Sequence, residues 1–235
     1  MYTGPSIVTD GMVLSLDAAN TKSYVSGSTV WSDLSGNANN GTLTNGPTFN
    51  SANGGSIVFD GTNDYIGTSY KLFTGTDSSN PVTIAFYINP DSSQSVVTNS
   101  PIWIGTAYYS GFGLQYTGTV YRIWIRVSGG TYTNNIPIQP SVFQHVVLIW
   151  GGFSDPKIYS YFNGSLNSEQ AVSDTDFGQD LSSRPFRIGL PYTSGGNTAT
   201  GYFKGKIANV QIYNRAVSAS EVQQNYNAQK SRFGL

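Results

Sequence analysis

The sequence contains no cysteine and only one histidine among its 235 residues. The lack of cysteine excludes disulfide bonds, thiolate zinc sites and cysteine nucleophiles. Glutamate is almost as scarce, since Glu169 and Glu221 are the only two in the chain. Three of the side chains that enzymes often use for nucleophilic or acid–base chemistry, namely cysteine, histidine and glutamate, are therefore absent or rare.

Charge is also scarce. Charged residues make up 11% of the chain, and 12 basic and 13 acidic side chains nearly cancel. No basic run could neutralise a row of phosphates, which argues against nucleic-acid binding. No stretch approaches the roughly 20 apolar residues of a membrane span, and the first residues do not resemble a signal peptide. We expect a soluble protein without a membrane partner, which is not exported by the general secretory route.

What the sequence does contain is short apolar runs, rich in Val, Ile, Tyr, Phe and Trp, between clusters of Gly, Asn, Asp, Ser and Pro. This pattern is typical of many short strands joined by tight turns. Apolar and polar residues alternate in 82–88 and 121–127, as in strands with one buried face. The other expected strands are 12–17, 56–60, 65–68, 112–116, 142–150, 157–163, 186–190 and 203–213.

Roughly a dozen strands without intervening helices cannot form βαβ units, so the sequence predicts an all-β, antiparallel two-sheet sandwich. No internal repeat or long linker is present, and we expect a single domain over residues 1–228. The dipeptides Asp60-Gly61 and Asn163-Gly164 favour hairpin turns, because both residue types tolerate positive φ.

One helix is expected near the end of the chain, over 219–228. Ser218 and Glu221 have the spacing of a capping box, and Val217 and Val222 that of a hydrophobic staple. The remaining residues, 229–235, read as a short tail with an exposed Phe233 and Leu235, which either frays or docks on a partner.

Six segments in this order and spacing resemble the concanavalin A-like lectin/glucanase superfamily, in particular its LamG-like jelly-roll members. They are 31–41 (WSDLSGNANNG), 57–66 (IVFDGTNDYI), 82–88 (VTIAFYI), 161–164 (YFNG), 186–189 (FRIG) and 205–218 (GKIANVQIYNRAVS). The resemblance implies a curved jelly-roll sandwich for carbohydrate or protein recognition, sometimes with calcium, and in some branches glycoside hydrolysis. Residues 10–20 (DGMVLSLDAAN) and the ending are similar to versions of this domain in tailed-phage structural proteins.

Hydrolysis of a glycosidic bond requires two carboxyl groups about 5 to 10 Å apart. Glu221 belongs to the capping box, and Glu169 lies in what reads as a Ser/Asn-rich loop without an acidic partner. Asp174 and Asp176 stand two apart, but a solvated loop is the simpler interpretation. His145, within an expected strand, reads as a structural residue. We therefore expect no catalytic residues and no enzyme activity.

Two loops offer oxygen ligands for calcium. The first carries them at alternate positions, on Asp33, Ser35, Asn37 and Asn39. The second, between two expected strands, contains Asp60 and Asp64. Either loop alone reads as an ordinary turn, but Asp33, Asp60 and Asp64 could hold one ion if the loops meet in space.

Sugar binding depends on aromatic faces and on planar polar groups. Arg122, Trp124 and Arg126 fall on one face of their strand, opposite its apolar residues, and Tyr159 and Tyr161 do so on theirs. If these strands share a sheet, the five residues form a ligand-binding platform. The alternative is an aromatic layer covered by the rest of the protein or by a neighbouring subunit.

Three functions follow from these observations. The first is a non-catalytic virion-surface protein, a capsid decoration or tail fibre assembled in the host cytoplasm, which binds other virion proteins or itself and also host glycans. The second is an extracellular, free-standing lectin, with calcium as its only candidate cofactor. The third is a glycoside hydrolase with an atypical site.

Overall fold

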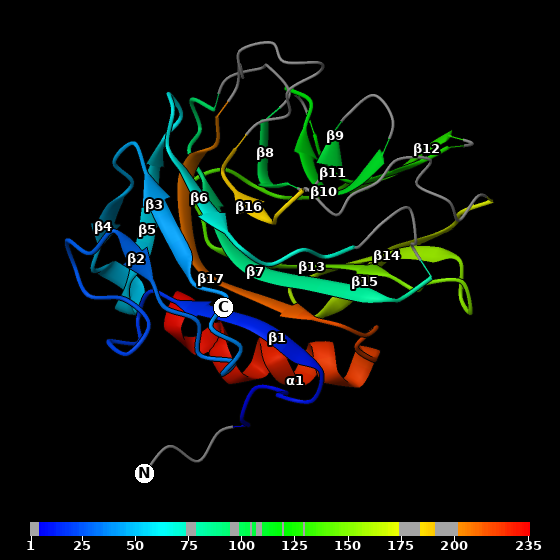
Figure 1. Cartoon of the computed structure of the whole chain (residues 1–235), viewed down its shortest axis with the longest axis horizontal. Coiled ribbons are helices and arrows are strands. Elements are labelled where there is room, and N and C mark those ends of the chain that lie inside the picture. Colours follow the sequence, from blue (N-terminus) through cyan, green and yellow to red (C-terminus); the bar gives the residue numbers. More distant parts are fainter. Residues whose placement is uncertain are drawn as a thin grey trace.

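The computed structural model describes residues 5–73, 79–94, 99–103, 105–106, 110–118, 120–128, 130–173, 184–190 and 202–235. In these residues, seventeen strands form two antiparallel sheets that pack face to face, and one α-helix lies outside them (Figure 1). The predicted all-β sandwich with one short C-terminal helix is therefore confirmed. No helix in this part of the chain has the length and apolar character that a membrane crossing requires.

The first sheet consists of β1 (Met12–Asp17), β4 (Thr48–Asn50), β5 (Ser56–Asp60), β7 (Val82–Pro90), β13 (Gln144–Trp150), β14 (Lys157–Phe162), β15 (Ser165–Ala171) and β17 (Lys204–Tyr213). Their order is β15-β14-β13-β7-β17-β5-β4, and β1 also pairs with β17. The long strands β7 and β17 thus lie side by side at the centre of this sheet.

The second sheet consists of β2 (Val30–Trp31), β3 (Gly41–Thr44), β6 (Tyr65–Thr68), β8 (Asn99–Trp103), β9 (Gly105–Thr106), β10 (Ser110–Tyr116), β11 (Tyr121–Val127), β12 (Gly130–Ile136) and β16 (Arg187–Ile188). Their order is β12-β11-β10-β8-β16-β6-β3-β2, and β9 pairs with β10. In Figure 1 this sheet arches over the first one.

The core fills the space between the sheets because alternate side chains of each strand point inward. From the first sheet it receives Ile84 and Phe86 of β7, and from the second Ile123 and Ile125 of β11. All four are fully buried. The inward apolar side chains predicted for both strands are therefore confirmed, but the prediction of a single buried face was wrong for 82–88, because Ala85 and Tyr87 on the other side of β7 are buried as well.

The two predicted turns have different outcomes. Asn163 and Gly164 both have positive φ (47° and 82°) and join the paired strands β14 and β15, as predicted for a hairpin. The prediction for Asp60-Gly61 was wrong, because β5 belongs to the first sheet and β6 to the second. This turn is a corner that carries the chain from one sheet to the other.

Two polar strands, β12 and β15, were not predicted, and Glu169 lies on β15 rather than in a loop. Both are edge strands, so their outward residues meet water and need not be apolar. The two edges also approach each other, since Asn167 Nδ2 donates a hydrogen bond to the carbonyl oxygen of Asn135 (2.7 Å). This contact closes the sandwich along one side.

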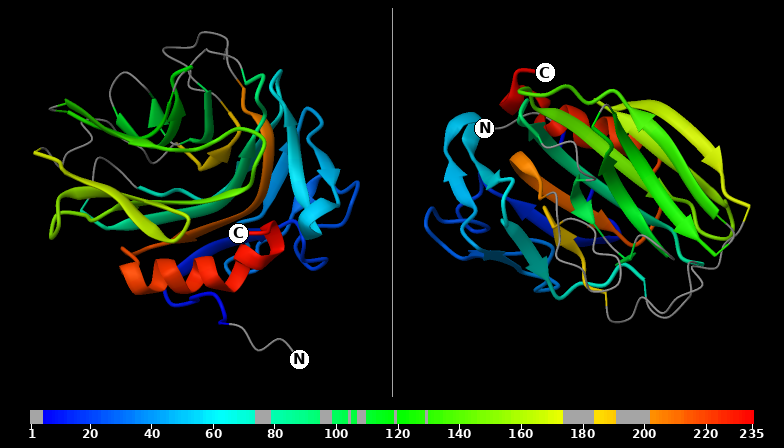
Figure 2. Two further views of the ribbon diagram at one scale, coloured as in Figure 1. Left: turned by 180° about the vertical axis from the view of Figure 1, so that it is seen from behind. Right: turned by 90° about the horizontal axis from the view of Figure 1, so that it is seen from above.

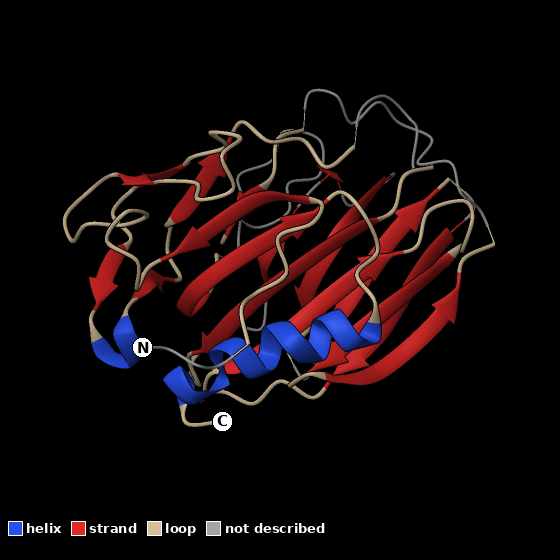
Figure 3. Ribbon diagram, turned by 90° about the horizontal axis from the view of Figure 1, so that it is seen from below, coloured by secondary structure: helices blue, strands red, loops and turns tan. Residues whose placement is uncertain are grey.

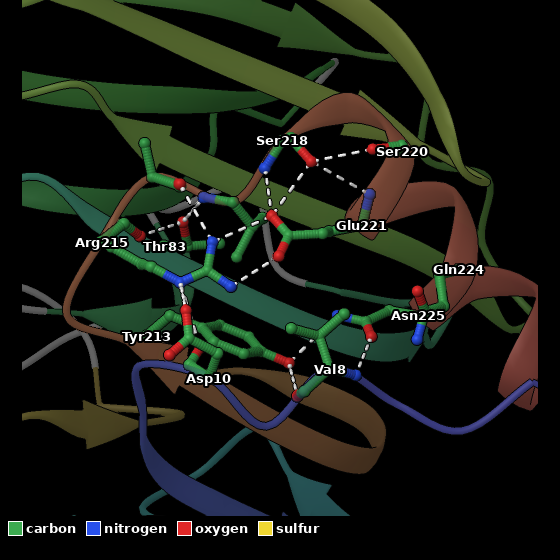
Figure 4. Close-up of polar contacts among 12 residues, drawn as sticks. Val8, Asp10, Thr83, Tyr213, Arg215, Ser218, Ser220, Glu221, Gln224 and Asn225 are labelled. Atoms are coloured by element: carbon green, nitrogen blue, oxygen red, sulfur yellow. Dashed lines mark hydrogen bonds and ion pairs between the residues drawn. The ribbon is translucent and has the colours of Figure 1, made fainter.

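The predicted capping box opens helix α1 (Ala219–Gln229). Ser218 Oγ accepts from Glu221 N (3.3 Å), and Glu221 Oε2 accepts from Ser218 N (2.7 Å). Arg215 donates two further bonds to the Glu221 carboxylate (2.6 and 2.9 Å) and pairs with Asp10 (3.0 Å), as Figure 4 shows. These hydrogen bonds, led by that from Arg215, lower the pKa of Glu221 to about 2.

The same helix fastens the N-terminal segment (Figure 4). Val8 N donates to Asn225 Oδ1 (2.8 Å), and Asn225 Nδ2 donates to the Tyr213 hydroxyl (3.0 Å). That hydroxyl in turn donates to the Val8 carbonyl oxygen (3.0 Å). The three bonds form a closed ring that joins the start of the chain, β17 and α1.

Helix α1 covers the outer face of the first sheet, as Figures 2 and 3 show. Val217 and Val222, the predicted staple, pack there against Val147, Ile149 and Tyr161. All five are buried. The central strands β7, β13 and β17 of the first sheet are thus buried on both faces.

The C-terminal residues continue this cover through the short 3₁₀ helix η2 (Lys230–Phe233). The ring of Phe233 stacks on that of Tyr87, with centroids 4.2 Å apart, while Leu235 is 38% exposed. The prediction of an exposed Phe233 was wrong, because its ring packs against the aromatic layer of the chain itself. Residues 230–233 pack as part of the sandwich.

Arg232 anchors this end. It pairs with Asp17 (2.7 Å) and donates hydrogen bonds to the carbonyl oxygens of Asn53 (2.6 Å) and Gly55 (2.5 Å). Asn53 belongs to the other 3₁₀ helix, η1 (Ala52–Gly54), and Asp17 belongs to β1. One side chain therefore connects three distant parts of the sequence.

His145 is fully buried in the aromatic layer beneath α1. Its ring lies 4.8 Å from that of Tyr87 and 5.8 Å from that of Tyr226, and its Nδ1 has no hydrogen-bond partner in the described part of the chain. Burial lowers its pKa to about 3. No substrate can reach this ring, in agreement with a structural role.

The anchor leads to a prediction for Arg232→Ala. The substitution removes an ion pair and two hydrogen bonds to carbonyl groups, so we expect the free energy of unfolding to fall by about 1–3 kcal/mol. Urea denaturation measures this, and Lys22→Ala, on an exposed side chain, serves as the control. Equal stability of both variants and the parent protein would contradict the anchoring role.

The buried histidine predicts acid sensitivity. Because the unfolded chain takes up a proton near pH 6.5 and the folded one only near pH 3, stability falls as pH drops through this window, by about 2 kcal/mol at pH 5. His145→Phe should flatten the loss between pH 7 and 5 in urea titrations. Glu221→Gln should leave that window unchanged, because the Glu221 contribution is lost only below about pH 4.5. An unchanged slope in His145→Phe would refute the assignment.

Candidate functional site

The two outer faces of the sandwich differ. Helix α1 and the two ends of the chain cover the face of the first sheet. The outer face of the second sheet instead carries polar and aromatic side chains, because its apolar residues, such as Leu43, Ile66 and Ile188, point into the core. A ligand site on a sheet face is therefore expected on the second sheet.

Three of the predicted ligand-binding residues lie on this face, and we call Arg122, Trp124 and Arg126 the β11 row. Arg122 Nε and Nη2 donate to Gln115 Oε1 on the neighbouring strand β10 (2.9 and 2.6 Å). Trp124 is only 5% exposed, which leaves little of its ring for a ligand. Arg122 and Arg126 are half-buried.

The structure does not bring Tyr159 and Tyr161 to the β11 row, because β14 belongs to the first sheet. Tyr161 is buried in the apolar layer that α1 covers. The Tyr159 hydroxyl donates to Asp155 Oδ2 (2.6 Å), and burial together with this carboxylate raises the pKa of Tyr159. The predicted five-residue platform is therefore divided between two opposite faces.

The three candidate calcium ligands do not converge either, and the described residues contain no cluster of three metal-binding side chains. The Asp33 carboxylate accepts hydrogen bonds from Ser15 N, Ser35 N, Ser35 Oγ and Asn39 N (2.7–3.0 Å). Asp64 is buried, accepts from Asp60 N (2.9 Å), and has a pKa raised by burial. These carboxylates organise their own loops.

The candidate catalytic carboxylates are also engaged. Glu169 pairs with Lys157 (3.5 Å) on the surface of the first sheet, and Glu221 is held by Arg215 and Ser218. Asp174 and Asp176 lie outside the described residues.

A groove of about 470 Å³ opens on the outer face of the second sheet, at β3, β6 and β16. This volume falls within the range of about 300–1,000 Å³ that is typical of small-molecule sites. Hydroxyl, amide, aromatic and guanidinium groups line it, and we call it the Tyr65 groove. Its lining residues are Ala38, Asn40, Thr42, Thr44, Tyr65, Gly67, Thr68, Ser69, Pro185 and Arg187.

Strand register explains the shape of the Tyr65 groove. Gly67 lies between Thr42 on β3 and Arg187 on β16, and it supplies a floor without a side chain. Thr44 lies opposite Tyr65, whose ring centroid is 5.7 Å from Arg187 Cζ. The groove and the β11 row share one face, three strands apart, or about 14 Å at ordinary strand spacing.

Sequence reasoning missed the Tyr65 groove. The alternation of Tyr65 and Gly67 with Ile66 and Thr68 indicates an outward face, but not which residues lie beside it. Arg187 comes from a strand more than a hundred residues later. Only the register between β6 and β16 joins them.

Several solved structures share this fold. The chain is similar to domain 4 of AbnA, a GH43 extracellular arabinanase from Geobacillus stearothermophilus, in complex with arabinotriose (TM-score 0.68, 16% identity, 92% of this chain and 98% of that one). It is also similar to the ligand binding domain of botulinum neurotoxin serotype D in complex with N-acetylneuraminic acid (0.71, 14%, 94% and 52%) and to Trypanosoma rangeli sialidase (0.68, 18%, 96% and 34%). The chain thus spans about half of the toxin domain and a third of the sialidase.

A search of curated protein sequences finds no significant match. The model of one family matches residues 60–223, which is more than half of the chain and includes Tyr65 and Arg187. The chain therefore belongs to the concanavalin A-like lectin/glucanases superfamily.

Proposed function

We propose that this protein is a non-catalytic carbohydrate-binding module that holds its ligand in the Tyr65 groove. The observation that carries the proposal is the chemistry of the lining, in which an aromatic ring stands among hydroxyl, amide and guanidinium groups on the outer face of the second sheet. Aromatic rings stack on the C–H faces of sugars, and these polar groups can bond sugar hydroxyls.

Two of the similar structures support this proposal, since they contain arabinotriose and N-acetylneuraminic acid. At 14–16% identity the likeness concerns the fold, so the choice of site on this chain rests on its own residues. The β11 row, on the same face, would extend contact to a longer ligand through Arg122 and Arg126.

The absence of catalysis is part of the proposal. Glycoside hydrolysis requires a carboxyl pair facing the substrate. No carboxylate lines the Tyr65 groove in the described residues. Glu169 and Glu221 lie on or beside the first sheet with basic partners.

A place on a virion surface is the specific setting that we propose for this module, on the basis of the phage-like segments at both ends of the sequence. Purified particles of the source should then contain the chain in stoichiometric amount by mass spectrometry. Its absence from particles would reject this setting and leave the carbohydrate-binding proposal untouched, with a free-standing lectin as the alternative.

The binding proposal is tested on a glycan array with the purified protein. We expect Tyr65→Ala to weaken the best ligand at least tenfold, because a stacking surface and the Arg187 contact are lost. Tyr159→Ala, a half-buried tyrosine on the opposite sheet, is the matched control and should bind normally. A chelator should leave binding unchanged, because Asp33, Asp60 and Asp64 form no common cluster in the described residues. Absence of binding to any glycan, or equal loss in both variants, would reject the site.

A further inference from the structure

The Tyr65 groove has a marked imbalance of charge. Of its ten lining residues, Arg187 is the only ionised one, and no carboxylate accompanies it. A half-buried guanidinium is partly removed from water, so it gains more from an anionic partner than an exposed one would.

Arg187 differs from Arg122, Arg215 and Arg232, each of which donates hydrogen bonds to an acceptor on another side chain. Arg122 donates to Gln115, Arg215 to Asp10 and Glu221, and Arg232 to Asp17. The contact of Arg187 within the described residues is with the ring of Tyr65. That contact holds the plane of the guanidinium and leaves its N–H groups for an acceptor from outside.

The neighbouring polar groups favour the same kind of ligand. Asn40 Oδ1 accepts a hydrogen bond from Asp33 N (2.9 Å), so the free end of this amide is the Nδ2 donor. Thr42, Thr44 and Ser69 add hydroxyl groups, which bond both acceptors and sugar hydroxyls. The lining as a whole is rich in donors.

Gly67 forms the floor of the groove because it has no side chain, and not because its backbone needs a conformation that only glycine adopts. Its φ is not positive, and a Cβ atom there would meet only Tyr65 Cε2, at an ordinary 3.7 Å. A larger side chain at this position would therefore fit the backbone and fill the groove between Thr42 and Arg187. This provides a way to block the site without removing any polar group.

We propose that the ligand of the Tyr65 groove is an acidic saccharide, whose carboxylate or sulfate group is bound by Arg187. This inference rests on the proposed carbohydrate-binding function and adds its chemical class. A carboxylate or sulfate accepts two parallel N–H bonds from a guanidinium, while Asn40, Thr42 and Thr44 bond the ring hydroxyls. A lining of hydroxyl and amide groups matches the many hydroxyl groups of a sugar, which an acidic peptide lacks.

The test is a calorimetric titration of the protein with four probes: a uronate-containing oligosaccharide, the same oligosaccharide after carboxyl reduction, a sulfated oligosaccharide and a polyglutamate peptide. Of the two acidic sugars, the uronate and the sulfated form, one will bind more tightly. We expect the reduced sugar to bind at least tenfold more weakly than that one. Raising the salt concentration should weaken only the acidic probes.

Variants assign the effect to the groove. Arg187→Gln should lose at least tenfold for acidic sugars and little for the reduced one, Arg187→Lys should recover part of the loss, and Gly67→Val should weaken both. Lys157→Gln, a cation on the other sheet, is the control. If circular dichroism shows that Arg187→Gln does not fold, the Gly67→Val variant and the comparison of the four probes still test the proposal.

The outcomes separate the two proposals. Equal binding of reduced and acidic sugars, blocked by Gly67→Val and indifferent to Arg187→Gln, would overturn the acidic class and keep carbohydrate binding. Failure of every saccharide would reject both. Tight polyglutamate binding that displaces the uronate would overturn the inference in favour of a protein ligand.

Discussion

The pairing of β17 with β7 at the centre of the first sheet is the interaction on which the rest of the structure depends. Strand β17 joins β7, β5 and β1, so it connects both halves of the sheet. Its inward residues enter the core, and its outward Tyr213 bonds the N-terminal segment and α1. A strand with both faces buried and both edges paired cannot move without disrupting the whole domain.

This arrangement decides which surface is free. The first sheet needs α1, Phe233 and the N-terminal segment to cover its apolar outer side chains, which include Val147, Ile149 and Tyr161. The second sheet carries Thr42, Thr44 and Arg187 on its outer face instead, and these groups require no cover. The polar lining of the groove is thus a consequence of how the domain divides its apolar residues between the sheets.

Much of the fold could be predicted from local sequence. Apolar runs between turns, such as β1, β5 and β6, the alternating strand β11 and the capped helix α1 depend on neighbours in the chain. The edge strand β15 could not be predicted, because a strand that faces water needs no apolar period. The corner at Asp60-Gly61 resembles a hairpin turn locally, and only the pairing of β5 with β17 and of β6 with β3 distinguishes the two.

The candidate site was less predictable than the fold. Which face of a strand points outward can be read from alternation, as for Trp124 and Tyr161, but whether that face is covered depends on elements far away in sequence. Tyr161 lies under a helix that begins at residue 219. The groove likewise requires Arg187 beside Gly67, a register that no local pattern encodes.

The cover on the first sheet also has a geometrical consequence. The described chain starts at residue 5 and ends at Leu235, and both ends run along the side that α1 occupies (Figure 1). The Tyr65 groove lies on the other sheet. Anything joined to either end, whether a further polypeptide or a solid support, would therefore be attached at the first sheet and not at the sheet that carries the groove.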